Sequence, residues 1–151
     1  LYQASAAGYR GVVEELVRSG AHVDGANNEN ITPLMIAAYN GHQSVCEILL
    51  GLGRANVHHR DNSAKTALVL ASYEGHAPVV QLLIAHGADV NVTDQYGWTA
   101  LMLAAYAGRH AVCKVLLDNG ADPIVATSNG KNAYVLAREA GYDDVATLLA
   151  Q

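Results

Sequence analysis

The 151-residue sequence has no phenylalanine, three prolines and only two cysteines. Cys46 and Cys113 are too few for a disulfide framework, and two thiols without an evident partner favour a reducing compartment. No apolar run approaches the roughly 20 residues that cross a bilayer, so no membrane contact is expected. These absences predict an intracellular protein of the cytoplasm rather than a secreted or membrane-spanning one.

Charged residues are also few. The chain has nine Lys and Arg against 14 Asp and Glu, which gives a net charge of −5. A general nucleic-acid binder carries a basic cluster, and this chain has none, so nucleic acid is not expected as a partner. The sequence also lacks the Gly-x-Ser-x-Gly, His-Glu-x-x-His and Cys-x-x-Cys motifs of common catalytic sites. We therefore predict that the protein is not an enzyme.

Glycine, in contrast, recurs with a fixed period. Steps of 33, 34, 33 and 33 residues separate the members of a first series, which are Gly8, Gly41, Gly75, Gly108 and Gly141. A second series follows the first by 12 residues and consists of Gly20, Gly53, Gly87 and Gly120. Each of these ends an apolar run such as "VVQLLIAHG", where a helix typically finishes with a left-handed residue that glycine adopts cheaply. The period indicates a repeat protein in which glycine is structural and forms no phosphate loop.

Every repeat has the same internal order. A turn such as "DQYGWTAL" opens it, and a short helix follows. We expect Thr32, Thr66 and Thr99 to be N-caps of these helices and Pro33 to take the first helical position of one. A glycine turn then leads into a longer helix, as in "HQSVCEILLGLG", and a loop of the "GADVN" type returns to the next turn.

The segments "ITPLMIAAYNGH", "KTALVLASYEGH" and "WTALMLAAYAGR", with the loop "HGADVNVTD", resemble ankyrin repeats, and the resemblance covers essentially the whole chain. It implies an all-α ankyrin-repeat solenoid of helix-turn-helix units with projecting β-turn loops. We divide a single domain, residues 1–151, into repeats 1–26, 27–60, 61–93, 94–126 and 127–151, with the first and last as caps. By the same resemblance we expect a monomer that serves as a scaffold or adaptor.

One loop departs from the pattern. Arg54 is inserted after a glycine of the second series and accounts for the single step of 34 residues. The fourth turn position is glycine in two repeats but Asn30 and Ala64 in the other two. A left-handed backbone costs alanine about 1 kcal/mol, whereas Asn tolerates it. We expect the loop from Arg54 to Lys65 to be the least regular part of the array.

Small residues and thiols are expected in the core. The pairs that should lie between adjacent short helices are Ala37-Ala38, Ala71-Ser72 and Ala104-Ala105. Cys46 and Cys113 occupy the same helical slot two repeats apart, which places the sulfurs roughly 16–20 Å from one another if helices pack at 8–10 Å. A disulfide needs a much shorter separation, so both thiols should be buried and free.

The seven histidines do not form a metal-binding pattern. His42 and His76 directly follow first-series glycines, where the ankyrin resemblance implies that the imidazole ties neighbouring repeats together. The tandem pair His58-His59 is expected to be solvated. Zinc needs three or four convergent ligands, so we expect neither a metal nor another cofactor.

Partners of ankyrin arrays usually contact the turn tips and the exposed face of the short helices. In three successive repeats one slot of that face holds tyrosine, and a turn beside the third adds Tyr96 and Trp98. Tyrosine and tryptophan are enriched at binding hot spots. The candidate partner-binding residues are therefore Ile31, Tyr39, Lys65, Tyr73, Glu74, Tyr96, Trp98 and Tyr106. An alternative stays open, in which the tyrosines only brace the turns against the short helices.

Three functions compete at this point. The favoured hypothesis is a non-catalytic module that binds a peptide or protein on its concave face through the aromatic column. A second is a reader of a cation such as methyl-lysine, in an aromatic box of Tyr73, Glu74, Trp98 and Tyr106. A third is a structural spacer for domains outside this sequence. The stretch around Asn91 also resembles ankyrin sites where asparagine is hydroxylated, but a structural side-chain hydrogen bond is the favoured explanation and Asn91 is not a candidate site residue.

Overall fold

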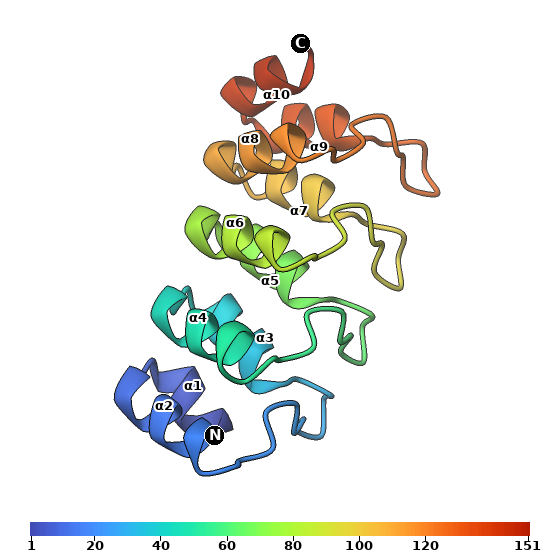
Figure 1. The fold of residues 1–151 in the computed structure, drawn as a ribbon. Helices are drawn as coiled ribbons and strands as arrows, with labels where there is room; N and C mark the ends of the chain where they lie inside the picture. The colour runs from blue at the N-terminus through green and yellow to red at the C-terminus, as the bar shows by residue number, and fades with distance from the viewer.

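The computed structural model describes residues 1–151 and contains ten helices in five antiparallel pairs. The helices are α1 (Tyr2–Ala7), α2 (Arg10–Arg18), α3 (Pro33–Tyr39), α4 (Gln43–Gly51), α5 (Ala67–Glu74), α6 (Ala77–Ala85), α7 (Ala100–Tyr106), α8 (His110–Asp118), α9 (Ala133–Ala140) and α10 (Asp143–Leu149). The pairs stack in chain order, and the turn loops project on one side (Figure 1). The predicted all-α solenoid is confirmed, while our repeat boundaries and the capping role of the ends stay predictions.

The starts of the short helices follow the predicted capping. The hydroxyls of Thr32, Thr66 and Thr99 accept hydrogen bonds from the backbone N–H three residues later, at 3.3, 3.4 and 3.2 Å. Pro33 opens α3, where its missing N–H is not needed. In the last repeat Asn132 does the same, accepting from the Val135 N–H at 3.0 Å. The segment "TSNGKN" is therefore an ordinary repeat turn and not a phosphate loop.

The glycines after the long helices have the expected left-handed conformation in all but one case. Gly20, Gly87 and Gly120 have φ between 87° and 90°, in the left-handed region. The prediction was wrong for Gly53. Arg54, the inserted residue, takes the left-handed conformation instead, with φ of 52°. The extra residue lets the chain run one position further before it reverses, so the strained backbone falls on Arg54.

Neighbouring repeats are tied together at the first-series glycines. His42 donates from Nε2 to the Ala6 carbonyl at 3.0 Å, and His76 donates to the Tyr39 carbonyl at 2.9 Å. Each imidazole lies so close to the glycine of the preceding repeat that an added Cβ would meet it at less than 3 Å. The predicted role of both histidines is confirmed.

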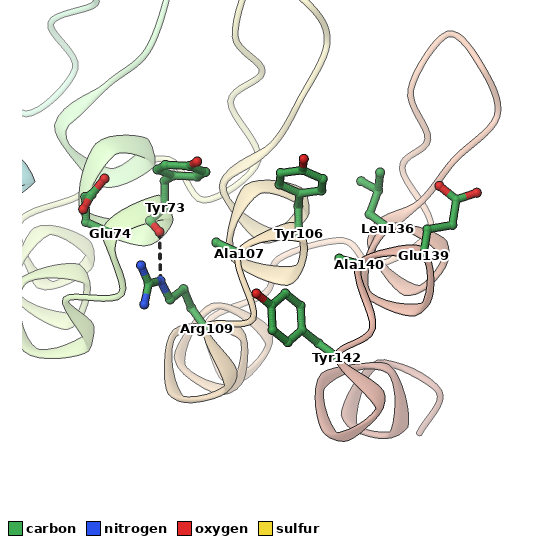
Figure 2. A pocket seen from close by; sticks show the side chains of 9 residues that line it. All are labelled: Tyr73, Glu74, Tyr106, Ala107, Arg109, Leu136, Glu139, Ala140 and Tyr142. Atoms are coloured by element: carbon green, nitrogen blue, oxygen red, sulfur yellow. Dashed lines mark hydrogen bonds between the residues drawn. The ribbon is translucent and has the colours of Figure 1, made fainter.

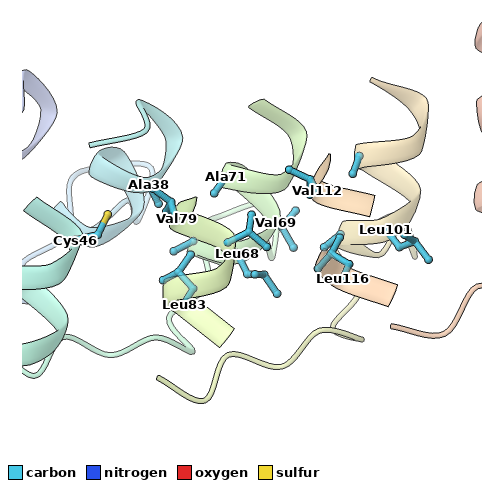
Figure 3. Packing of buried hydrophobic residues seen from close by; sticks show 14 of the residues in the cluster. Ala38, Cys46, Leu68, Val69, Ala71, Val79, Leu83, Leu101, Val112 and Leu116 are labelled. Carbon is cyan, nitrogen blue, oxygen red and sulfur yellow. The ribbon is translucent and has the colours of Figure 1, made fainter. Parts of the chain in front are cut away.

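The core runs the length of the stack. Alanines and one serine fill the space between successive short helices, and they are fully buried at Ala38, Ala71, Ser72 and Ala105. Figure 3 shows Ala38 and Ala71 among the larger valines and leucines of the long helices. The thiols of Cys46 and Cys113 are buried and unpaired, as predicted. Burial raises the pKa of both to about 12, so neither forms a reactive thiolate near neutral pH.

The loop from Arg54 to Lys65 contains two of the three non-glycine residues with positive φ, Arg54 and Ala64. The third is Asn30, at the turn position equivalent to Ala64. His58 is exposed, but the expectation that His59 is solvated was wrong. Its Nε2 lies 3.1 Å from the Asn30 carbonyl, so it bridges two neighbouring turns.

Candidate binding face

Three tyrosines lie at the C-terminal ends of successive short helices. Tyr39, Tyr73 and Tyr106 end or nearly end α3, α5 and α7, and their exposed fractions are 41%, 42% and 49%. The three helices contact one another in order. The equivalent slot of α9 holds Glu139 rather than an aromatic ring.

The turn before α7 adds two more aromatic rings that behave differently. Tyr96, at the tip, is 68% exposed. Trp98 is half-buried and packs against the core, with its ring edge-on to Tyr106 at a centroid distance of 5.7 Å and an angle of 86°. Edge-to-face packing of this kind holds both rings in place. Trp98 therefore contributes to the fold as well as to the surface.

The largest hollow on this face, which we call the aromatic groove, has a volume of about 770 Å³. It lies over α5, α7 and α9 and over the starts of α8 and α10 (Figure 2). Tyr73, Tyr106 and Leu136 point the same way from the three short helices, and the small residues Ala107 and Ala140 lie between them. The lining residues are Tyr73, Glu74, Tyr106, Ala107, Arg109, Leu136, Glu139, Ala140 and Tyr142.

Two lining residues hold the base of the aromatic groove. Arg109 donates from Nε to the Tyr73 carbonyl at 3.0 Å and so ties α8 to α5. The ring of Tyr142 lies against Gly108, where an added Cβ would meet ring carbons at 2.5 to 2.7 Å. Both residues stand in the slot of His42 and His76; Arg109 makes the same hydrogen bond to a carbonyl of the preceding repeat, and Tyr142 makes only the close contact with the glycine.

A second hollow of about 700 Å³, the inter-turn hollow, lies between the turn tips of the last two repeats. It shares Tyr106, Leu136 and Glu139 with the aromatic groove, so the two hollows are adjacent. Its other lining residues are Gln95, Tyr96, Trp98, Thr127, Ser128, Asn129 and Lys131. A third hollow is formed by Lys65, Tyr73, Asp94, Tyr96, Trp98, Leu103 and Tyr106.

The two lysines along these hollows are already paired, whereas Arg109 in the aromatic groove has no ion-pair partner. The Lys65 ammonium lies 3.4 Å from the buried carboxylate of Asp94, and the Lys131 ammonium lies 2.7 Å from Glu139. Asp94 also accepts hydrogen bonds from two backbone N–H groups of its own turn. Lys65, predicted to face a partner, therefore takes part in holding a turn.

Glu74 stands at the other edge of the aromatic groove without an ion-pair partner in residues 1–151. Its negative charge, with a hydrogen bond and partial burial, raises the pKa of the Tyr39 hydroxyl above its usual value. Tyr39 and Ile31 lie away from the groove, in a separate apolar pocket of about 150 Å³ with Met35, Ile36 and Leu70. The eight predicted residues thus fall into neighbouring hollows and not into one site.

The four residues of the proposed aromatic box do not line one common hollow. Tyr73 and Tyr106 line both the aromatic groove and the third hollow. Glu74 lines only the aromatic groove, whereas Trp98 lines the third hollow and the inter-turn hollow but not the groove. The ion pair of Lys65 and Asp94 also lines the third hollow. No group of three His, Cys, Asp or Glu side chains is arranged to hold a metal ion within residues 1–151.

Sequence analysis missed Leu136, Arg109 and Tyr142 as part of this face. The sequence does contain a pattern that predicts Leu136. The fourth residue of each short helix is apolar in four successive repeats, as Ile36, Leu70, Leu103 and Leu136. Arg109 and Tyr142 directly follow first-series glycines, and nothing in their period shows that they border a hollow.

No helix of the chain is long and apolar enough to cross a membrane. A search of curated proteins found no match to the chain. A family model described as Ankyrin repeats (3 copies) matches residues 1–94 and again residues 68–151, so the two matches together span the chain. With this match, the 33-residue period and the five stacked helix pairs, the chain belongs to the ankyrin-repeat family.

Proposed function

We propose that the protein binds a protein partner through the aromatic groove, with an apolar side chain of the partner packed among Tyr73, Tyr106 and Leu136. Ankyrin repeats are generally protein–protein interaction modules, and the family is typically non-enzymatic. The proposal adds to this general role the location of the contact on the array.

The observation that carries the proposal is the gathering of exposed rings in one continuous hollow. Tyr73 and Tyr106 leave more than two fifths of their surface in water, although neither ring is needed to fill the core. Large apolar surface left exposed in a hollow typically marks a binding site. Aromatic anchors in such positions provide much of the binding energy of protein interfaces.

The charge of the groove indicates which partner residue would lie next to that apolar side chain. Lys131 neutralises Glu139, which leaves Glu74 as the acid at the groove edge without an ion pair. A Lys or Arg of the partner next to the apolar anchor would pair with Glu74. A pair at the rim adds more to selectivity and to the association rate than to affinity.

The reader of methylated lysine has less support. Its four residues share no single hollow, because Glu74 lines the aromatic groove whereas Trp98 lines the inter-turn hollow and the third hollow. The spacer hypothesis predicts no use for the exposed rings and is tested by the same experiment.

The test compares proteins captured from cell lysate by the wild type and by the Tyr73→Ala/Tyr106→Ala variant. Trp98 is left unchanged, because it packs against the core and its removal would disturb the fold. Tyr9→Ala is the matched control, since Tyr9 is 63% exposed but lies outside all of the hollows described above. Circular dichroism checks that the variants fold.

We expect a partner that binds the wild type and Tyr9→Ala to lose at least about tenfold in affinity for the double variant. Equal capture by all three proteins would place the binding surface elsewhere. The loss of a partner in Tyr9→Ala alone would move it to the first repeat.

A further inference from the structure

Hydrogen bonds between main chains link the turn tips of the second, third and fourth repeats. The Asn62 N–H donates to the Glu29 carbonyl at 3.1 Å, and the Gln95 N–H donates to the Ser63 carbonyl at 3.0 Å. These two bonds occupy equivalent positions in successive turns, so the tips form a short ladder that runs along the array. Figure 1 shows the same turns projecting from one side of the stack.

Side chains strengthen the same two junctions. At the first, the Asn62 amide donates to the Asn28 carbonyl at 3.3 Å. At the second, Arg60 donates to the Thr93 carbonyl, and Lys65 pairs with Asp94. Each junction is therefore closed by both backbone and side-chain contacts.

The ladder stops at the third junction. The next bond in the series would run from the Ser128 N–H to the Tyr96 carbonyl, and neither group has a hydrogen-bond partner in the protein. The bases of the two loops remain tied, because the Asp122 N–H donates to the Asn91 side chain at 2.9 Å. The loops are joined at their bases and open at their tips, and the inter-turn hollow lies at this opening.

The residue that opens the turn also differs at this junction. Asn27, Asp61 and Asp94 each accept hydrogen bonds from two N–H groups of their own turn through one side-chain oxygen. The equivalent residue of the last turn, Thr127, accepts only from the Lys131 N–H, at 3.2 Å. The Asn129 N–H is therefore also without a partner in the protein.

We propose that the open junction is a slot for an extended polypeptide segment of the partner. The segment completes the ladder, with one of its carbonyls accepting from the Ser128 N–H and one of its N–H groups donating to the Tyr96 carbonyl. An extended chain offers both groups at main-chain spacing, as in the addition of a strand to a sheet edge. A side chain of the segment packs against Trp98 and Tyr106 on the wall of the slot.

The chemistry of the slot favours a peptide over an ion or a small charged ligand. It presents a main-chain donor and a main-chain acceptor together, and an extended peptide can satisfy both with one segment. Lys131 and Glu139 neutralise each other at 2.7 Å, so the slot lacks a net charge to attract an ion. Aromatic rings form one wall of the slot. The hydroxyl of Ser128 and the amide of Asn129 form the other.

The inference rests on the proposed function, because Tyr106 borders both the aromatic groove and the slot. It goes further in that the slot recognises the main chain of the partner. The probe is a set of short linear peptides selected from a random phage-displayed library on the full chain. Trp98 is the only tryptophan and lines the slot, so its fluorescence reports peptide binding directly.

Three measurements follow on a selected peptide. N-methylation of single peptide amides should weaken binding roughly tenfold at one position, where the donor to Tyr96 is lost. Amide exchange at Ser128 should slow in the complex while exchange at Asn62 and Gln95 does not change. Thr127→Asp should weaken binding roughly tenfold, because a carboxylate that also holds the Asn129 N–H gives the last turn the geometry of the others and closes the slot.

Asn27→Asp is the matched control, since it adds the same charge at the same turn position of a junction that is already closed. The slot proposal is overturned if no selected peptide changes Trp98 fluorescence, or if either N-methylation at every position or Thr127→Asp leaves affinity unchanged. If Tyr73→Ala weakens binding while Thr127→Asp does not, the aromatic groove stands and the slot fails. The reverse result retains the slot and rejects the groove.

Discussion

A single residue slot between the short helices determines how closely successive repeats approach. Ala38 and Ala105 fill it in two inner repeats, and Ser72 takes the same place in α5. Ser72 is fully buried, and its hydroxyl has no hydrogen-bond partner. A buried hydroxyl without a partner has lost its bonds to water, which costs about 1–3 kcal/mol.

Replacing Ser72 with alanine should therefore stabilise the protein. We expect the free energy of unfolding to rise by about 1 kcal/mol in Ser72→Ala, because the unpaired oxygen is removed and little volume is lost. The reciprocal variant Ala105→Ser adds a hydroxyl to the same slot one repeat later and should lower stability by a similar amount. Urea unfolding measures both. Destabilisation by Ser72→Ala would mean that the hydroxyl has a partner after all.

For single residues, the sequence predicts the position in the repeat better than it predicts the burial of the side chain. The repeat places Tyr39, Tyr73 and Tyr106 in one slot, and all three are exposed there. The same argument assigned Trp98 and Lys65 to the surface, yet Trp98 packs on the core and Lys65 pairs with a buried carboxylate. The repeat period predicts the backbone position of a residue. The burial and contacts of its side chain depend on residues of neighbouring repeats, which only stacking brings together.

At the scale of the element, a glycine serves two separate purposes. Gly41 and Gly87 both have positive φ, of 74° and 90°. An added Cβ at Gly41 would meet the His76 imidazole at 2.6 Å, whereas at Gly87 it would meet nothing within 4 Å. One glycine permits a backbone conformation and the close approach of a neighbouring repeat, and the other permits the conformation alone.

The two substitutions Gly87→Ala and Gly41→Ala should separate these costs. Gly87→Ala should lower the free energy of unfolding by about 1–2 kcal/mol, the cost of a left-handed alanine. Gly41→Ala should cost at least about 3 kcal/mol, because the His76 ring must also move and lose its bond to the Tyr39 carbonyl. Chemical denaturation of both variants gives the difference. Equal losses would show that His76 adapts without penalty.

Much of the element pattern could be predicted because capping and glycine turns are local. The N-caps at Thr32, Thr66 and Thr99 follow from three or four consecutive residues. The shift of the left-handed position from Gly53 to Arg54 was missed, because an insertion can be absorbed at either residue. The open junction at Thr127 was missed too, since it depends on contacts between turns that are a full repeat apart.

For the whole molecule, stability comes from contacts between neighbours in the stack. Each short helix packs on the next short helix and on its own long helix. Arrays of this kind behave approximately as a chain of repeats linked by nearest-neighbour interfaces. A defect at one interface should therefore uncouple the repeats on its two sides without unfolding all of them.

The last repeat provides a way to test this. Arg138 occupies in α9 the slot that Ala105 fills in α7, and its side chain is exposed and bonded to the Tyr134 hydroxyl. Ala105→Arg would force the same long, charged side chain between α7 and α9, where the native alanine is fully buried. We expect α9 and α10 to detach, because burying an unpaired guanidinium costs several kcal/mol.

Hydrogen exchange measured residue by residue distinguishes local from global unfolding. In Ala105→Arg, amides of α9 and α10 should lose protection, while those of α3 to α6 keep nearly all of theirs. Arg138→Ala is the control at the equivalent slot and should leave the protection of α3 to α8 unchanged, because the arginine is exposed. Uniform loss of protection across all ten helices in Ala105→Arg would instead mean that the array folds as one cooperative unit, and that the interface between α7 and α9 supports repeats far beyond its own neighbours.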